Sequence, residues 1–211
     1  MTENIINNRR LIQTFKPTLS KEDAKQLLLT MEQSRQYIWH CRDYALIYLM
    51  LTTALRSVEV RRAKIKDITS IGDTYIIYIL GKGRSSKDSY VKLTPSVKTA
   101  IDTYLALRKD GNPYLFISHS FHTDTLYLSR NALKDILKRV LKVSSLQHLK
   151  LTPHSLRHTA ATLNFKSGAK LEDIRLQLRH SDITTTSIYV HEETTGDEND
   201  IEHFIWNTPN E

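Results

Sequence analysis

The stretch LTPHSLRHTAATLNFKSG, residues 151–168, carries the signals of one complete helix. Thr152 can cap the free backbone amides, and Pro153 suits the first helical position. Gly168 is well placed to end the helix. The sequence therefore predicts a helix that begins at Pro153.

The two faces of this helix differ in chemistry. At about 100° per residue, His154, Arg157 and Ala161 fall on one side. The opposite side collects apolar residues, namely Leu156, Ala160 and Leu163. We expect one face to pack while the other presents an imidazole and a guanidinium. The alternative is an ordinary amphipathic helix with a solvated polar face.

Composition predicts a globular protein of one large domain or two small ones. The chain has 211 residues, of which 40% are hydrophobic, and this is enough for a core. The single cysteine, Cys41, cannot form an internal disulfide, and no stretch has the pattern of a membrane span or a signal peptide. We expect a reducing, cytoplasmic setting and no membrane partner.

Charge is divided unevenly along the chain. The formal net charge is +7, but residues 191–211 contain neither Lys nor Arg. They hold seven acids: Glu192, Glu193, Asp197, Glu198, Asp200, Glu202 and Glu211. The other 16 acids against 30 bases give residues 1–190 a formal charge of +14. A segment with this charge is typical of a protein that binds a polyanion. Charge alone does not show whether the partner is DNA, RNA or an acidic protein, and a basic surface that is simply solvated is the alternative.

Periodicity and capping signals predict a mainly α fold with a small antiparallel β-sheet. Two β-rich runs, 73–80 and 89–93, are joined by the Gly- and Ser-containing stretch 81–88, which suggests a hairpin. Helices besides the one at Pro153 are expected at residues 20–33, 37–55, 95–109, 130–142 and 171–180. Their expected caps include Ser20, Thr94 and Ser129.

The domain organisation follows from these segments. Residues 1–17 are polar and read as a tail or linker, and residues 18–191 form a single domain. Residues 192–211 form an acidic tail that ends in an apolar stretch around Phe204 and Trp206. This tail can pack on its own body or dock on a neighbouring protomer.

Several residues suit phosphodiester cleavage without a metal. That reaction needs a nucleophile, cations on the non-bridging oxygens and an acid for the departing alkoxide. Metal ligation fits less well, because no His/Cys cluster has ligand spacing.

Arg56 is expected at the end of the apolar helix 37–55, where a guanidinium needs an anionic partner if it turns inward. Glu59, three residues later, can orient it, and a plain structural ion pair is the alternative.

Lys82 lies between glycines at the hairpin tip, where the backbone can approach a ligand. Lys87 is the second candidate for that role, and hairpin lysines often only keep an edge soluble.

His180 and Tyr189 complete the set, nine residues apart in RHSDITTTSIYVH. Free tyrosine has a pKa near 10, so a nucleophilic Tyr189 needs nearby arginines or a base. A buried, hydrogen-bonded tyrosine is the alternative.

Together these residues resemble the tyrosine recombinase (phage integrase) family. The series ALRSVE, GKG, TPHSLRHTAAT and RHSDITTTSIY follows the order and typical gaps of the family's Arg, Lys, His-x-x-Arg, His and Tyr residues. The resemblance covers the chain from about Thr18 to His191.

The resemblance implies a role for each position. Tyr189 would attack the scissile phosphate and form a 3′-phosphotyrosyl link, while Arg56 and Arg157 hold the non-bridging oxygens. Lys82 would protonate the leaving 5′-oxygen. The remaining roles fall to His154 and His180, in proton transfer and hydrogen bonding, and to Glu59 as a supporting acid.

The resemblance also implies partners: double-stranded DNA, and a homo-oligomer that is a tetramer on DNA, with a monomer in free solution left open. It implies neither a metal nor another cofactor. Candidate DNA contacts are Arg130, Lys134, Lys138, Lys87 and Arg179.

Two features depart from the family. Arg179 stands where the family usually has a glycine. The family's common N-terminal DNA-binding domain has no room before Thr18, which leaves a catalytic fragment or a short member as alternatives.

The predicted function is a site-specific recombinase of the integrase or invertase type. The alternatives are a type IB topoisomerase-like enzyme, a non-catalytic DNA-binding regulator of the same fold, and a metal-free nuclease that uses the two histidines.

Overall fold

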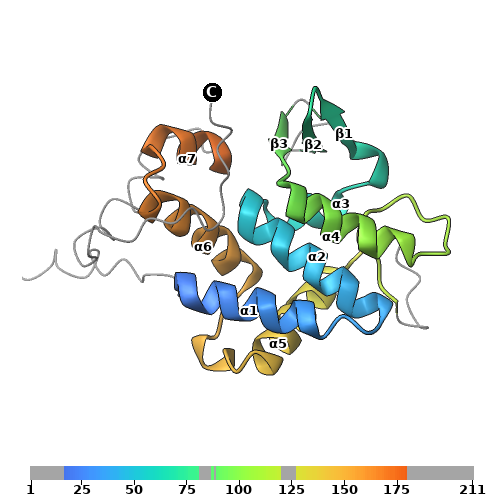
Figure 1. Cartoon of the computed structure of the whole chain (residues 1–211), viewed down its shortest axis with the longest axis horizontal. Helices are drawn as coiled ribbons and strands as arrows, with labels where there is room; N and C mark the ends of the chain where they lie inside the picture. Colours follow the sequence, from blue (N-terminus) through green and yellow to red (C-terminus); the bar gives the residue numbers. More distant parts are fainter. Residues whose placement is uncertain (1–16, 81–86, 88, 120–126, 180–211) are drawn as a thin grey trace, which may run out of the picture.

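The apolar helix expected over residues 37–55 lies at the centre of the fold. In the computed structural model it is α2 (Ile38–Thr53), and 12 of its 16 residues are buried (Figure 1). The structure describes residues 17–80, 87, 89–119 and 127–179. Helix α2 packs against α1 (Lys21–Gln33), α4 (Pro95–Ala106), α5 (Arg130–Val143) and α6 (Pro153–Lys166). Because other helices surround it, α2 is apolar on nearly all sides.

The remaining elements are all shorter than these five helices. They are the helices α3 (Ser57–Arg62) and α7 (Leu171–Leu178), the strands β1 (Ile68–Ile71), β2 (Thr74–Ile79) and β3 (Ser89–Lys92), and the 3₁₀ turns Ile65–Asp67 and Gln147–Leu149. Figure 1 shows the sheet at the upper right and α6 and α7 at the upper left, with the last turn of α2 between them. The prediction of a mainly α fold with a small antiparallel sheet is confirmed.

Helix starts follow the predicted caps. The side chain of Ser20 accepts a hydrogen bond from the backbone N–H of Asp23 at 3.0 Å, and Thr94 and Ser129 cap α4 and α5 in the same way. Thr152 and Ser155 cap each other's backbone N–H at the start of α6. Each bond satisfies a donor that the first helical turn leaves free.

The sheet has one strand more than the sequence predicted. Strand β1 pairs antiparallel with β2, with Ile68 opposite Ile77, and β2 pairs with β3, with Ile77 opposite Val91. A tight turn at Gly72, whose φ is +55°, joins β1 to β2. The prediction missed β1 because the strand has only four residues and is mostly exposed. The predicted hairpin tip lies outside the described residues, apart from Lys87.

The predicted end of the central helix was wrong by two residues, and this changes the place of Arg56. Helix α2 stops at Thr53 because Ala54 adopts a left-handed conformation, with φ +52°. Arg56 therefore does not belong to α2. It is the N-cap residue of α3, which places its backbone at the start of a helix rather than at the end of one.

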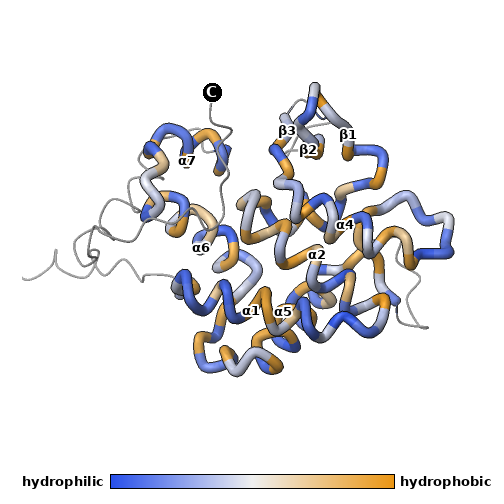
Figure 2. The backbone as a smooth tube through the Cα atoms, in the orientation of Figure 1, coloured by the Kyte–Doolittle hydropathy of each residue, from blue (hydrophilic) through white to orange (hydrophobic). Residues whose placement is uncertain are grey.

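The core encloses charged as well as apolar side chains. Figure 2 shows hydrophobic residues along the inner elements. The fully buried side chains include Leu46, Leu51 and Phe116. Asp43, which is 2% exposed, accepts hydrogen bonds from the Nε and Nη2 atoms of Arg42 at 2.9 and 2.7 Å. Arg139 on α5 donates to its other oxygen at 2.5 Å. Among the described residues, no helix is long and apolar enough to cross a membrane.

The substitution Asp43→Asn tests this buried network. We expect it to lower the free energy of unfolding by about 3–5 kcal/mol, because it leaves the buried Arg42 guanidinium without a counter-charge. Urea denaturation measures the change. Asp102→Asn is the matched control, since Asp102 forms an exposed ion pair with Lys98, and its effect should stay within about 1 kcal/mol. Equal losses in the two variants would contradict the account of the core.

Candidate active site

Arg157 joins the C-terminal ends of two helices. Its Nη1 donates to the backbone oxygen of Ala54, after α2, at 2.5 Å, and its Nη2 donates to the backbone oxygen of Leu178, the last residue of α7. The residue is 2% exposed. The expectation that this face of α6 presents its cation outward is therefore wrong for Arg157, because helix-end carbonyls surround the guanidinium. Such carbonyls lack intrahelical partners and carry partial negative charge.

Arg56 and Glu59 form the ion pair that their spacing predicts. The Nη1 of Arg56 donates to Oε1 of Glu59 at 3.0 Å, and the backbone N–H of Arg56 donates to Oε2 at 2.6 Å. The Glu59 side chain is fully buried, whereas 34% of the Arg56 side chain is exposed. Glu59 thus fixes a guanidinium that still reaches the surface.

Arg179 brings a third guanidinium to the same place. Its Nη2 donates to Oε2 of Glu59 at 2.6 Å, and its backbone oxygen accepts from Nη2 of Arg56 at 3.4 Å. Burial lowers the pKa of the Arg179 guanidinium, and the charge of Arg56 lowers it further, whereas Glu59 opposes both effects. Arg56, Glu59, Arg157 and Arg179 together are called the arginine–glutamate cluster below.

His154 lies one turn before Arg157 on α6 and is exposed. Its ring centroid is 4.5 Å from that of His158, one turn further along the helix. Exposure leaves the His154 imidazole accessible at the surface of α6, so only this member of the predicted pair faces outward. Lys82, His180 and Tyr189 lie outside the described residues.

The predicted DNA contacts fall into two groups. Arg130, Lys134 and Lys138 are exposed along α5. Lys87, by contrast, forms an ion pair with the buried Asp67, which also accepts the backbone N–H of Lys64 at 2.7 Å. In this structure Lys87 is therefore paired within the protein.

Arg61 and Arg62 on α3 are basic residues that were not predicted as part of the site. Nη1 of Arg61 donates to the backbone oxygen of Leu128 at 3.2 Å, and its guanidinium lies 5.9 Å from the centre of the Tyr127 ring. Burial lowers the pKa of Arg61, and the nearby charges of Arg62 and Arg130 contribute to the lowering. The run VRRAKIK, residues 60–66, was the signal for this basic group, because it holds four cations in seven residues.

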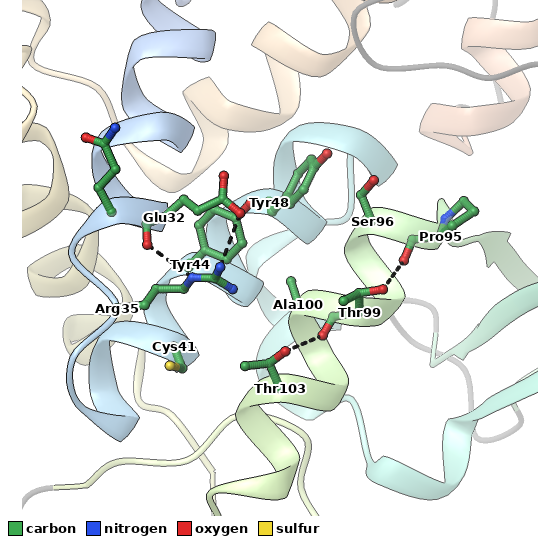
Figure 3. Close-up of a pocket in the computed structure, with 11 residues that line it drawn as sticks. Glu32, Arg35, Cys41, Tyr44, Tyr48, Pro95, Ser96, Thr99, Ala100 and Thr103 are labelled. Atoms are coloured by element: carbon green, nitrogen blue, oxygen red, sulfur yellow. Dashed lines mark hydrogen bonds and ion pairs between the residues drawn. The ribbon is translucent and has the colours of Figure 1, made fainter.

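One hollow in the described structure lies apart from the arginine–glutamate cluster. It is a groove of about 750 Å³ between α4 and the first half of α2 (Figure 3), and Arg35, Tyr44 and Thr99 are among its lining residues. Burial is the main cause that raises the pKa of Tyr44 to about 12. None of the predicted site residues lines the groove.

Among the described residues, no group of three or more His, Cys, Asp or Glu side chains could hold a metal ion.

Comparison with known proteins places the chain in a family. The family described as the phage integrase family matches residues 17–195, which include all of the arginine–glutamate cluster. This chain belongs to the phage integrase family.

Curated relatives carry the name of tyrosine recombinases. The chain is 30% identical over 194 residues to tyrosine recombinase XerD of Listeria innocua, and the match covers 88% of this chain and 61% of that protein. It is 29% identical over 184 residues to tyrosine recombinase XerA of Pyrococcus furiosus, covering 87% of this chain and 60% of that one. The chain thus spans about three fifths of the length of these relatives.

Solved structures share the fold. A post-cleavage complex of the XerH site-specific recombinase with a palindromic difH substrate superposes with a TM-score of 0.71 at 27% identity, covering 85% of this chain and 51% of that one. A crystal structure of XerA recombinase gives a TM-score of 0.68 at 28% identity, covering 82% and 60%.

The substitution Arg157→Lys tests the contact between the two helix ends. We expect a loss of about 2–3 kcal/mol in the free energy of unfolding, because one ammonium group cannot reproduce the fork that reaches Ala54 and Leu178. Urea denaturation measures it. Arg175→Lys is the matched control, because Arg175 pairs within α7 with the exposed Glu172, and it should change nothing measurable. If Arg157→Lys were as stable as this control, the two contacts would not hold the helix ends together.

Proposed function

We propose that this chain is the catalytic domain of a site-specific DNA recombinase that cuts and rejoins DNA through a 3′-phosphotyrosyl intermediate. The observation that carries the proposal is the meeting of Arg56 and Arg157 at the C-terminal end of α7. The two residues are about a hundred positions apart in sequence, and both donate to carbonyls of consecutive residues there. The chain continues from this point directly to His180 and Tyr189.

The proposed reaction needs no cofactor. The hydroxyl of Tyr189 attacks the phosphorus, a bond forms between them, and the bond from phosphorus to the 5′-oxygen breaks. The phenolic proton passes to a neighbouring base, for which His154 or His180 is suited, and Lys82 gives a proton to the leaving 5′-oxygen. Attack by the 5′-hydroxyl of a second strand reverses these steps and completes strand exchange.

The arginines would act on the phosphate itself. Charge accumulates on its non-bridging oxygens as the phosphorus becomes five-coordinate, and fixed cations lower the barrier most where that charge develops. The Arg56 guanidinium is held by Glu59 and remains one-third exposed, so it is both fixed and accessible. One well-aimed donor contributes about 3–4 kcal/mol, and slow phosphodiester cleavage requires several such donors.

The position of the cluster suits a duplex better than a small molecule. The cluster lies where α2, α3, α6 and α7 meet and not in the groove of Figure 3. A duplex needs a basic open surface, since neutralised phosphates supply much of the affinity. Arg61, Arg62 and Arg130 would extend such a surface from α3 to the start of α5.

Assembly follows from the proposed chemistry. Exchange between two duplexes requires four cut strands and hence four copies of the chain on DNA. The acidic tail, residues 192–211, lies outside the described residues, and we propose that it docks on the body of its own or a neighbouring protomer.

Tyr189→Phe tests the nucleophile. We expect the variant to bind DNA as the wild type does and to form no covalent adduct, because the attacking oxygen is gone. The assay incubates each protein with a nicked duplex in EDTA and looks for a DNA-shifted protein band on a denaturing gel. Tyr90→Phe, on an exposed strand position, is the control and should retain the adduct.

Three results, two from this assay and one from an assay with supercoiled plasmid, would decide against the proposal. An adduct in the Tyr189→Phe variant would show that another residue attacks. Net release of cut DNA without any adduct would indicate a nuclease. Relaxation of supercoiled plasmid without exchange between two sites would indicate a topoisomerase.

Arg130→Gln tests the proposed basic surface. We expect weaker binding to DNA of any sequence and a decrease of about 1 in the slope of log affinity against log salt, because one phosphate contact is lost. Fluorescence anisotropy over a range of salt concentrations measures the slope. Lys142→Gln, at the far end of the same helix and also exposed, removes the same charge. If both variants changed the slope equally, Arg130 would act through net charge alone.

A further inference from the structure

Arg179 occupies a backbone conformation that its side chain makes unfavourable. It follows the last residue of α7 with φ +53° and ψ +45°, in the left-handed region that glycine adopts readily and residues with a Cβ atom adopt seldom. A glycine would end this helix with less strain, so the arginine side chain must be explained by what it contacts.

The side chain adds two further costs. It is 17% exposed, so a charged group is largely removed from water. Its Nε is buried and has no hydrogen-bond partner among the described residues. The contacts that the side chain makes must offset these costs.

What the side chain provides is a bond across the arginine–glutamate cluster. Nη2 of Arg179 donates to Oε2 of Glu59 at 2.6 Å, and Nη1 donates to the backbone oxygen of Gln177 at 3.0 Å. The guanidinium thus joins the last turn of α7 to α3. Glu59 does not depend on it for charge compensation, because the carboxylate also accepts two hydrogen bonds from Arg56.

The backbone around Arg179 contacts the other two arginines. The oxygen of Leu178 accepts from Nη2 of Arg157, and the oxygen of Arg179 accepts from Nη2 of Arg56. Both guanidiniums are therefore oriented by two consecutive carbonyls at the end of α7. Any movement of this end relative to α3 would displace both of them.

We infer that Arg179 is a positioning residue: its ion pair with Glu59 holds the end of α7 against α3 and thereby fixes the guanidiniums of Arg56 and Arg157. This inference rests on the proposed function, since it assigns Arg56 and Arg157 to the scissile phosphate. It gives Arg179 a role through other residues instead of the phosphate contact that its charge suggests.

The inference predicts an unusual combination of effects for Arg179→Gly. The unfolding midpoint should be equal to that of the wild type or higher, because strain and a buried charge are removed. Single-turnover cleavage of a nicked duplex at saturating protein should fall by about 10- to 100-fold, since small displacements of catalytic groups carry losses of this size. The dissociation constant and its salt slope should stay unchanged.

Two further variants separate the backbone from the side chain. Arg179→Ala should show the same loss of cleavage together with a lower unfolding midpoint, because alanine keeps the Cβ atom and loses the ion pair. Arg179→Lys should recover part of the cleavage rate, since an ammonium group can still pair with Glu59. In a Glu59→Gln background, Arg179→Gly should add no further loss.

Other results would overturn the inference. Unchanged cleavage by Arg179→Gly at saturation would exclude positioning. A weaker dissociation constant and a salt slope reduced by about 1, with normal cleavage at saturation, would instead assign Arg179 to a DNA phosphate.

A measurement without DNA separates this inference from the proposed function. In NMR spectra of arginine side chains, we expect Arg179→Gly to speed the hydrogen exchange of the Arg56 and Arg157 guanidiniums, because their carbonyl partners become mobile. Unchanged exchange would overturn the positioning role even if the wild type formed no adduct. If the wild type formed no adduct but the Arg179→Gly variant showed faster exchange, only the recombinase proposal would be rejected.

Discussion

The buried guanidinium of Arg157 constrains the arrangement of the helices around it. Arginine does not give up its proton in proteins, so a side chain that is 2% exposed must find acceptors inside the fold. The last carbonyls of a helix are suited to this, because they have no partner within the helix and carry partial negative charge. The ends of α2 and α7 meet at Arg157 for this reason, and the left-handed residues that follow, Ala54 and Arg179, turn the chain away at that point.

The same constraint holds both guanidiniums in place, while only that of Arg56 remains accessible. Arg157 is anchored by carbonyls, and Arg56 is anchored by Glu59 and by the carbonyl of Arg179. Cations that are held before a substrate arrives do not have to reorganise during the reaction, which is the main source of electrostatic catalysis. The excess of positive charge over the single Glu59 carboxylate makes the cluster a place that favours an added anion.

Much of this architecture could be predicted from the sequence. The caps Ser20, Thr94, Ser129 and Thr152 are local signals, and their bonds form within three residues of the chain. The pairing of Arg56 with Glu59 is local as well. The burial of Arg157 could not be predicted, because its acceptors come from residues about 100 positions earlier and about 20 positions later. The left-handed conformation of Ala54, which ends α2, could not be predicted either, because alanine is a strong helix former. The conformation of Arg179 explains why a glycine is usual at this position in the family that the sequence resembles.

The most direct test of the account concerns the charge on the scissile phosphate. A methylphosphonate at that position replaces one non-bridging oxygen by a neutral methyl group, so an enzyme no longer needs two cations there. If Arg56 and Arg157 neutralise the phosphate, Arg56→Ala, which removes the more exposed guanidinium, should be strongly defective in adduct formation on a phosphate substrate and should approach the wild-type rate on the methylphosphonate. An equal defect of Arg56→Ala on both substrates would contradict the account, because the arginine would then act on the fold and not on the charge of the reacting group.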